Sequence, residues 1–406
     1  MADIFKPVDA EGVQSAIRSA LADGKTLEVV GQGTKRGIGR LSQPDRVLQM
    51  SGLAGVTLYE PEELVLSARS GTPLADINDL LASRNQHLAF EPMDAGPLFG
   101  LPAGGGTLGG TLAANLSGPR RIKAGAARDH FLGAAAVSGR GEMFKSGGRV
   151  VKNVTGYDLC KLLAGSWGTL AVMTEVTVKV LPRPETEETI LISGLDDHAA
   201  GGAMSAALGS AADVSAAAHL PVAIAQQTGV EEVSATRSAA TALRIEGVAP
   251  SVVYRREMLK TSLKSFGEIS VLDEAQSRAL WSAIRDATPF AWAPKADSML
   301  WRISTVPASG PKLVGRLRET IEAEAFYDWG GGLIWLRTAG EGAEAVQACI
   351  VAFGGGAVLL AAPDRLRASA SAFSPQEPGL AALTRRVKES FDPGQTLNPG
   401  RIYAGV

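Results

Sequence analysis

The chain has 406 residues, too many for one ordinary domain, and 45% of them are apolar, enough to build buried cores. Its 40 basic and 42 acidic side chains give a formal net charge of −2, so charge gives no reason to expect nucleic acid as a partner. The two cysteines, Cys160 and Cys349, are too few for a disulfide framework or for the four thiolates of an iron–sulfur cluster.

The N-terminus and the longest apolar run argue against secretion and membrane insertion. No apolar segment flanked by basic residues opens the chain, so we expect no secretory signal. The longest apolar run, residues 349–363, contains three consecutive glycines and is too short to cross a bilayer. We therefore expect a cytoplasmic protein that contacts a membrane only through a partner.

Helical and strand patterns alternate over the first 90 residues, which is typical of α/β structure. A helix is expected over 9–24, with Asp9 as its N-cap. A second helix is expected to begin at Thr72-Pro73 and to run to Arg84. The expected strands are 27–30, 46–50, 56–59 and 64–69.

Residues 92–125 are rich in glycine and lack a clear helical or strand period. They contain more Leu and Ala than a disordered linker, so we expect an ordered loop whose backbone closely approaches a ligand. Residues 104–109 formally satisfy G-x-G-x-x-G, but Pro102 precedes them and Pro119 follows closely. A Rossmann fingerprint must follow a strand and open a helix, so a Rossmann site is disfavoured here.

The remaining chain is predicted to complete the first region and to add an α+β region. We expect a hairpin over 131–144, a helix over 157–164 and a strand over 169–181, with a domain boundary at Pro182 and Pro184. The boundaries divide the chain into residues 1–183, 184–370 and 371–406. Beyond 184, the expected strands are 221–225, 243–246, 300–305, 333–337 and 357–361, and the expected helices are 251–264, 274–287, 312–324, 343–353 and 380–390.

Three glycine-bearing loops fall in the first region, at residues 31–35, 104–118 and 165–169. Backbone N–H groups can hold a diphosphate without cationic side chains where glycine lets the chain come close. Each loop alone is more simply a structural turn, but the three together favour a dinucleotide site.

A longer motif ends in the third loop: residues 152–170 read KNVTGYDLCKLLAGSWGTL. This stretch resembles the signature of flavoproteins with a PCMH-type FAD domain, the vanillyl-alcohol oxidase superfamily. Further pieces occur in the family's order, namely loop 31–35, segments 106–110, 115–118 and 125–130, and the closing Asn398-Pro399-Gly400-Arg401. The resemblance covers residues 1–183 and the last thirty, and within the family the chain is most similar to the FAD-binding subunits of bacterial glycolate oxidases. It implies an α+β fold: a PCMH-type two-subdomain FAD-binding domain, an α+β cap domain and a C-terminal segment that returns to the flavin domain.

The resemblance also assigns site residues. The first loop and the segment Gly106–Thr111 would cradle the FAD pyrophosphate, and the other motif residues would line the rest of the cofactor. Many relatives have Glu where Trp167 stands, and several attach FAD covalently through a histidine in the first loop, which this chain lacks. Non-covalent FAD is therefore expected, held by Gly31, Gln32, Gly33, Thr34, Lys35, Gly106, Thr107, Gly109, Gly110, Thr111, Asn115, Ser117, Gly118, Gly125, Arg128, Asp129, Gly165, Ser166, Gly168, Thr169, Val172 and Asn398.

No catalytic or metal-binding residue can be assigned. Relatives that oxidise 2-hydroxy acids carry a histidine cluster that holds a metal and takes the substrate proton, whereas the four histidines here are dispersed at 87, 130, 198 and 219. Oxidation of a 2-hydroxy acid also needs a cation for the carboxylate. The candidates are Arg244, Arg255, Arg256, Arg302 and Arg337, and their spacing selects none of them.

These features predict a subunit of an FAD-dependent oxidoreductase that acts on CH–OH groups, in a complex that oxidises glycolate to glyoxylate and passes electrons to an acceptor other than NAD. By the resemblance, a sister flavoprotein subunit carries the fuller catalytic set and a third subunit carries iron–sulfur clusters. This chain would then bind FAD but oxidise glycolate poorly by itself. Two alternatives stay open: a free-standing FAD-dependent 2-hydroxy-acid or alcohol dehydrogenase, and a structural subunit with an empty flavin site.

Overall fold

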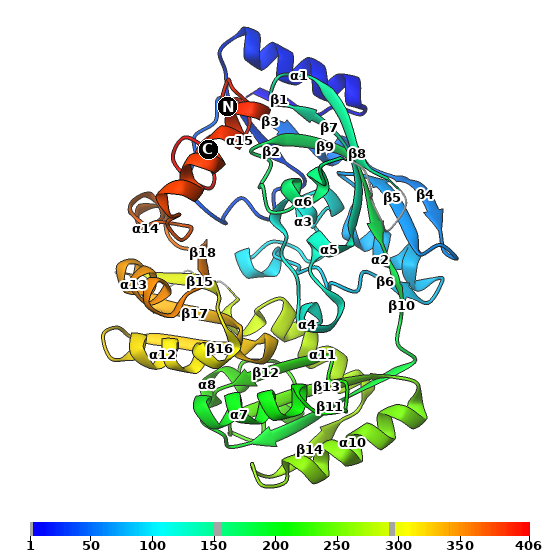
Figure 1. Cartoon of the computed structure of the whole chain (residues 1–406), viewed down its shortest axis with the longest axis vertical. Helices are drawn as coiled ribbons and strands as arrows, with labels where there is room; N and C mark the ends of the chain where they lie inside the picture. The colour runs from blue at the N-terminus through cyan, green and yellow to red at the C-terminus, as the bar shows by residue number, and fades with distance from the viewer. Residues whose placement is uncertain (1–2, 149–155, 292–296, 341) are drawn as a thin grey trace.

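The computed structural model describes residues 3–148, 156–291, 297–340 and 342–406. Residues 149–155, with Lys152 and Asn153 of the long motif, lie outside the described residues. Figure 1 shows two bodies, an N-terminal body that contains all elements up to residue 182 and a cap below it, with the C-terminal segment running back beside the N-terminal body.

The first subdomain of the N-terminal body is a small parallel sheet with one helix. Its strands are β1 (Asp3–Phe5), β2 (Leu27–Val30) and β3 (Arg46–Gln49), in the spatial order β1–β3–β2. Helix α1 (Ala10–Ala22) begins after Asp9, whose carboxylate accepts the Gly12 N–H at 2.7 Å. Val13, Ile17 and Ala20 recur at helical spacing on its buried face, which explains why this segment folds as predicted.

The second subdomain is a five-stranded antiparallel sheet in the order β4–β5–β9–β7–β8. Val176 and Val178 of its central strand are buried with Leu108 and Leu112, so the core lies between the sheet and a short helix, α3. The strands are β4 (Val56–Glu60), β5 (Val65–Arg69), β7 (Phe131–Ser138), β8 (Met143–Gly147) and β9 (Ala171–Lys179), and β6 (Gln86–His87) pairs separately with β10 (Leu181–Pro182). The helices are α2 (Leu74–Ala82), α3 (Leu108–Ala114), α4 (Arg121–Ala124), α5 (Ala127–His130) and α6 (Leu159–Leu163).

The cap is one eight-stranded antiparallel sheet with helices packed on one face. In spatial order its strands are β14 (Ile269–Leu272), β11 (Thr186–Ser193), β13 (Ala240–Gly247), β12 (Ala216–Leu220), β16 (Ala323–Asp328), β17 (Leu333–Ala339), β15 (Ser298–Ser304) and β18 (Gly356–Ala361). The helices on that face are α7 (Asp197–Leu208), α10 (Ala249–Leu263), α12 (Gly310–Arg318) and α13 (Ala343–Phe353). The other face packs on α11 (Glu274–Arg285) and on the N-terminal body, in a shared core that contains Leu116, Trp281 and Trp335.

The C-terminal segment returns to the N-terminal body. After α14 (Asp364–Ser369), helix α15 (Pro378–Phe391) lies beside the first subdomain (Figure 1), and its Phe391 ring meets Phe144 edge-on at 6.0 Å. Beyond α15, Leu397 forms a parallel bridge with Leu27 of β2. The end of the chain therefore lies beside the strand that leads into the first glycine loop. No helix among the described residues combines the length and apolarity that crossing a membrane requires.

Three predictions of secondary structure are wrong in detail. Residues 221–225 form helix α8 (Val222–Ala225), because Pro221 opens a helix and the strand β12 ends just before it. The helix expected over 312–324 ends at Arg318, and residues 323–328 form strand β16 of the eight-stranded cap sheet. The segment 92–125 contains α3, which Thr107 caps. Elements not predicted also include β1, β6, β10, β11, β12, β14, β16, α4, α5, α7, α9 (Glu231–Ser234) and α14.

Candidate functional site

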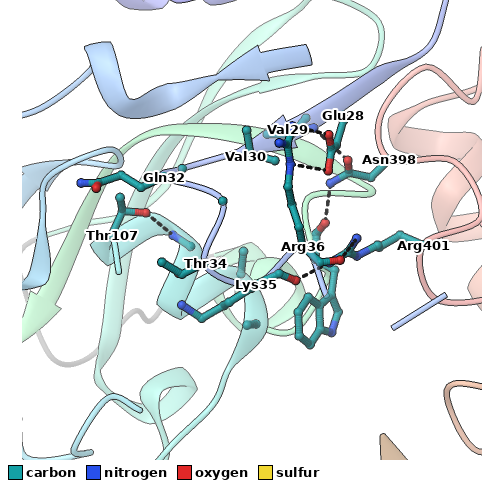
Figure 2. Close-up of a pocket in the computed structure, with 16 residues that line it drawn as sticks. Glu28, Val29, Val30, Gln32, Thr34, Lys35, Arg36, Thr107, Asn398 and Arg401 are labelled. Carbon is teal, nitrogen blue, oxygen red and sulfur yellow. Dashed lines mark hydrogen bonds and ion pairs between the residues drawn. The ribbon is translucent and has the colours of Figure 1, made fainter. Parts of the chain in front are cut away.

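A groove runs between the first glycine loop, the start of α3 and the third glycine loop (Figure 2). It consists of two adjoining cavities, a more polar one toward the C-terminal segment and a more apolar one toward β9. Both cavities are lined by Val29, Val30, Gly31, Thr107, Gly110, Ala113 and Trp167. Because they share these residues, the two cavities form one continuous groove.

The first loop, residues 31–35, leaves its backbone donors free. None of its five N–H groups donates a hydrogen bond to another described residue. Gly31 packs against Thr107, and a Cβ at Gly31 would lie 2.4 Å from Thr107 Oγ1, so only glycine fits there. A turn of free amides in contact with a second loop is an arrangement that holds anions such as a diphosphate.

The start of α3 forms the opposite wall. Thr107 is the N-cap, and its Oγ1 accepts the Gly110 N–H at 3.2 Å. The Gly109 N–H is already bonded to the Ser70 carbonyl at 2.8 Å, which fixes α3 against the turn after β5. Ser70 Oγ lines the groove and is buried without a hydrogen-bond partner among the described residues. Buried hydroxyls are nearly always hydrogen-bonded, so Ser70 points to a polar ligand in the groove.

The third loop holds a tryptophan in the groove wall. Gly165, Trp167 and Gly168 all have left-handed backbones, with φ of +82°, +54° and +71°. This conformation costs a tryptophan about 1–3 kcal/mol. Two hydrogen bonds hold it there, from the Trp167 N–H to the Ala113 carbonyl at 2.9 Å and from Asn398 Nδ2 to the Trp167 carbonyl at 2.7 Å.

The C-terminal tail joins the first and third loops. Asn398 Oδ1 accepts the Val29 N–H at 2.8 Å, while its Nδ2 holds Trp167. Arg401 Nη2 donates to the Lys35 carbonyl at 2.6 Å, and its guanidinium carbon lies 5.8 Å from the Trp167 ring centroid. The tail motif therefore fixes the spacing of the two loops that face each other across the groove.

A buried ion pair behind the third loop was missed in the sequence. Lys388 Nζ donates to Asp392 Oδ2 at 2.7 Å, to the Thr169 carbonyl at 2.7 Å and to the Leu397 carbonyl at 2.9 Å. Both side chains are almost fully buried, 1% and 0% exposed. The only signal was their spacing of four residues across the end of the helix expected over 380–390, and that spacing is just as common in exposed helix pairs.

Lys35 adds a cation to the first loop. Burial lowers the pKa of its ammonium group to about 8, although the Asp94 carboxylate raises it. Lys35 lines the groove and forms no ion pair within the described part of the chain. Its side chain is therefore available to an anionic ligand.

The expected cofactor-binding residues divide into two sets. Those that line the groove are Gly31, Gln32, Gly33, Thr34, Lys35, Thr107, Gly109, Gly110, Gly168, Val172 and Asn398. Those outside the lining of both cavities are Gly106, Thr111, Asn115, Ser117, Gly118, Gly125, Arg128, Asp129, Gly165, Ser166 and Thr169. In the second set, Asn115 Oδ1 accepts the Arg128 N–H at 3.0 Å and Ser117 Oγ accepts the Ala127 N–H at 2.9 Å, which folds the segment 115–118 onto α5. Direct contact of these residues with a cofactor stays a prediction.

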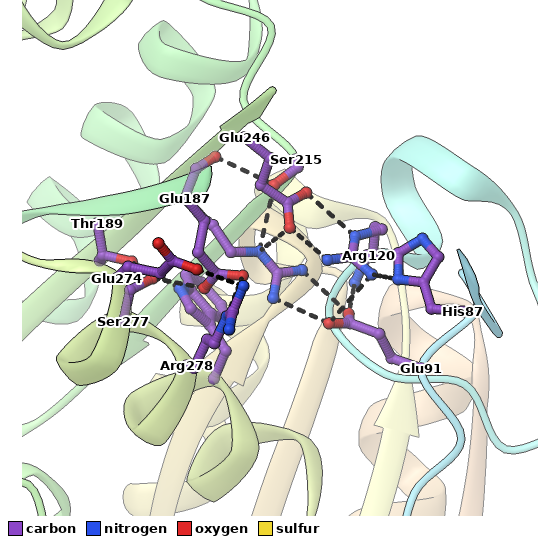
Figure 3. Close-up of polar contacts among 12 residues, drawn as sticks. His87, Glu91, Arg120, Glu187, Thr189, Ser215, Glu246, Glu274, Ser277 and Arg278 are labelled. Carbon is purple, nitrogen blue, oxygen red and sulfur yellow. Dashed lines mark hydrogen bonds and ion pairs between the residues drawn. The ribbon is translucent and has the colours of Figure 1, made fainter. Parts of the chain in front are cut away.

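A buried charge network joins the N-terminal body to the cap (Figure 3). Arg244 of β13 donates to both carboxylate oxygens of Glu91, at 2.9 and 3.0 Å, and Arg120 pairs with Glu246. Burial raises the pKa of Glu91, but the charges of Arg244 and Arg120 outweigh it and hold that pKa below its usual range. A cavity of about 510 Å³ lies beside the network and is lined by residues of both bodies, including His87.

The described histidines and Cys160 do not form a catalytic cluster. His87 Nδ1 lies 3.2 Å from Arg120 Nη1, and burial, followed by the Arg120 charge, lowers the pKa of His87 to about 4. His130 contacts backbone carbonyls, and His219 contacts the Thr241 hydroxyl through Nδ1 and lies 3.4 Å from Asp197 Oδ1 through Nε2. Burial raises the pKa of Cys160 to about 11, so this residue stays a thiol. Within the described ranges no group of three or more His, Cys, Asp or Glu side chains could hold a metal ion.

Comparisons with known proteins agree with this geometry. The model of the FAD binding domain family matches residues 2–147. The chain is 32% identical to the glycolate oxidase subunit GlcE of Escherichia coli over 396 residues, which cover 97% of each chain. It is 28% identical to the glycolate oxidase subunit GlcD of Bacillus subtilis, over 73% of this chain and 68% of that one.

Solved structures with the same fold include p-cresol methylhydroxylase with substrate bound and alkyldihydroxyacetonephosphate synthase. The first has a TM-score of 0.72 at 12% identity and covers 99% of this chain and 88% of that chain. The second has a TM-score of 0.70 at 16% identity, and the match covers 98% of this chain and 75% of that chain. These similarities confirm the two-subdomain FAD-binding fold expected from the sequence.

Proposed function

The chain belongs to the family of the glycolate oxidase subunit GlcE, and we propose from this membership that it is the FAD-binding subunit of a complex that oxidises glycolate to glyoxylate. It is an FAD-linked oxidoreductase whose relatives act on 2-hydroxy acids. The proposed electron acceptor is one other than NAD. The observation that carries the proposal is the groove, with its row of free amides in the first loop.

The residues of the groove fit FAD. Five free N–H groups in residues 31–35 and the Lys35 ammonium group suit a diphosphate, and the Gly31 contact lets the two loops close around it. Ser70 Oγ is a buried hydroxyl that lacks a partner in the described chain. FAD, when bound, supplies a two-electron acceptor that can also return its electrons singly. The protein's own part is to bind the cofactor, to orient it and to keep water from it.

Binding is proposed to be non-covalent. Among the described residues, no His, Cys or Tyr lines either cavity of the groove, and these are the side chains that could form a bond to the flavin ring. We assign the cofactor to residues 1–183 and 371–406, and the contact with substrate or partner to the cap, residues 184–370. We propose a cytoplasmic location, with any membrane contact made by a partner.

The relatives named as subunits imply a multi-subunit assembly for this chain. We propose that the partners are a sister flavoprotein subunit that oxidises glycolate efficiently and an iron–sulfur subunit that carries electrons onward. The two cysteines of this chain are too few for a cluster of its own, and its described histidines are dispersed. A subunit with an intact flavin groove and no histidine cluster among its described residues suits electron relay within such a complex.

The test is the rate at which glycolate bleaches bound flavin under anaerobic conditions. The isolated, FAD-loaded chain is expected to bleach slowly, and the complex co-purified from the native cell is expected to bleach fast and to contain iron. Rapid bleaching of the isolated chain, with turnover of a dye acceptor, would instead establish a free-standing dehydrogenase. A complex that is active while this chain lacks flavin would establish a structural subunit.

A further inference from the structure

Arg302 of β15 lies on the face of the cap sheet that packs against the N-terminal body. Side chains alternate between the two faces of a strand. In β15, Trp301 and Ile303 belong to the core under α12 and α13, whereas Leu300 belongs to the core shared with the N-terminal body. Arg302, two residues after Leu300, therefore points to the same interdomain face, beside the rings of Trp329 and Trp335.

Arg302 and Arg121 both lie over one indole ring. The guanidinium carbons of Arg302 and Arg121 are 4.8 and 4.3 Å from the Trp329 ring centroid. Trp329 Nε1 donates to the Gly118 carbonyl at 3.0 Å. Arg121 opens helix α4 three residues after Gly118, so the two cations flank the junction between the cap and the motif segment 115–118.

The other arginines considered as carboxylate ligands already have partners. Arg244 is bidentate to Glu91, and Arg255 donates to four backbone carbonyls. Arg256 pairs with Glu188 and Glu257, and Arg337 pairs with Glu324. For Arg302 and Arg121, the described residues provide ring contacts but no side-chain hydrogen bond and no ion pair.

The local charges leave this pair of guanidinium groups uncompensated. Burial, followed by the repulsion of Arg121, lowers the pKa of Arg302 to about 10, so it remains a cation at neutral pH. Asp328 is the neighbouring carboxyl, but it forms no ion pair with either arginine in the described structure, and burial raises its pKa to about 7. A guanidinium group presents five N–H donors in a planar fork, and leaving them without acceptors at an interface is costly.

We propose that Arg302 of the cap and Arg121 of the N-terminal body form an anion site between the two bodies that binds the carboxylate of a small organic acid. This inference rests on the proposed function for the identity of the acid, a 2-hydroxy acid, and it selects Arg302 from the five candidates that the sequence left open. The planar fork of Arg302 matches a carboxylate, and Trp329 holds both cations in place by stacking.

The test is calorimetric titration of the FAD-loaded chain with oxalate, which carries the carboxylate but no oxidisable C–H bond. Arg302→Met and Arg121→Met are each expected to weaken oxalate binding about 10- to 100-fold, the loss expected for a charge-assisted hydrogen bond. Arg302→Lys should recover part of the affinity, since it keeps the charge and loses the fork. Arg337→Met is the matched control: this residue lies opposite Leu300 on the adjacent strand, stacks on Phe290 and keeps a carboxylate partner, so its loss should leave oxalate binding unchanged.

The outcomes separate this inference from the proposed function. Arg121 is exposed, so Arg121→Met tests the site even where Arg302→Met fails to fold. Wild-type affinity in the folded Arg121 and Arg302 variants, no oxalate binding by the wild type, or tighter binding of inorganic phosphate than of oxalate would each overturn the inference. FAD content is measured in the same samples: a chain that takes up no FAD but still binds oxalate through Arg302 contradicts the proposed function alone.

Discussion

Single residues of the groove make contacts that leave no room for a larger side chain. Gly31 packs on Thr107, and Gly168 packs on the Asn398 amide, where a Cβ would lie 2.9 Å from Nδ2. The motif predicted glycine at both positions because a backbone must approach closely there. The structure shows which residue lies against each glycine. Those contacts form only when loops that are far apart in the sequence come together.

Substitution of Gly31 is predicted to weaken FAD binding. In Gly31→Ala the new methyl group collides with Thr107 Oγ1 and pushes the first loop away from α3, so FAD affinity should fall at least about tenfold, or about 1.4 kcal/mol. Fluorescence titration with FAD measures it. Thr107→Ala added to Gly31→Ala removes the colliding atoms and should restore part of the affinity. Gly315→Ala, where a Cβ meets nothing within 4 Å, is the control.

Protonation of His87 is predicted to destabilise the protein in mild acid. The pKa of His87 is about 4 when folded, against 6.5 for the free side chain, so the unfolded chain binds the proton first as pH falls. The contribution of neutral His87 to the free energy of unfolding is therefore fully present above pH 6.5 and is lost as the pH falls toward 4. Between pH 7 and pH 5 the wild type should lose about 2 kcal/mol more of its free energy of unfolding than His87→Gln, measured by urea unfolding. Equal losses in the two proteins would refute this assignment.

Among the secondary-structure elements, α15 and the tail after it hold the groove together from outside the N-terminal half. Lys388 of α15 fixes the Thr169 carbonyl of the third loop, and Asn398 ties that loop to β2. The site is therefore built from both ends of the chain. Removal of the tail is therefore expected to disrupt the groove, because its residues Leu397 and Asn398 are buried against the N-terminal body.

Loss of the buried Lys388 ammonium group is predicted to be severe. Lys388→Met leaves the Asp392 carboxylate buried without its cation, which should cost about 3–5 kcal/mol in the free energy of unfolding. The double variant Lys388→Met/Asp392→Asn should regain part of this, because it leaves no buried charge and the single amide oxygen still accepts one of the two N–H groups, of Thr396 and Leu397, that the carboxylate accepts. Chemical denaturation measures both. If Lys388→Met unfolds like the exposed-pair variant Arg316→Met, the ion pair does not hold the tail.

The elements that the sequence predicted well are those with a strong local pattern. Helix α1 has a cap and a regular apolar face, and β9 alternates valines, so local forces alone specify them. The strands β12 and β16 were missed because they lie in the middle of a wide sheet with both faces covered, so their residues do not alternate between apolar and polar. Helix α8 was mistaken for a strand because four apolar residues fit either structure.

The whole molecule depends on contacts between residues that are far apart in sequence. Glu91 and Arg244 are 153 residues apart, and no local pattern pairs them. The glycine loops could be predicted because each carries its own motif, whereas the charge network and the Arg302–Trp329–Arg121 stack exist only once the cap is docked. This is why the sequence predicted the cofactor but could not select one cap arginine as the carboxylate ligand.

The pairing of Glu91 with Arg244 is predicted to hold the cap on the N-terminal body. A double-mutant cycle with Glu91→Gln and Arg244→Met should give a coupling energy of at least about 1 kcal/mol. The exposed pair Arg316–Glu319 should give less than about 0.5 kcal/mol in the same cycle. Additive effects of the Glu91 and Arg244 changes would show that the cap is held by the shared apolar core alone.

The central claim is that loops from both ends of the chain hold one FAD without a covalent bond, and the absorption spectrum of the purified protein before and after acid precipitation tests it most directly. We predict a yellow protein with about one FAD per chain, all of it released into the supernatant by acid. A colourless protein that takes up no added FAD would contradict the account, and flavin that stays with the precipitate would contradict its non-covalent part.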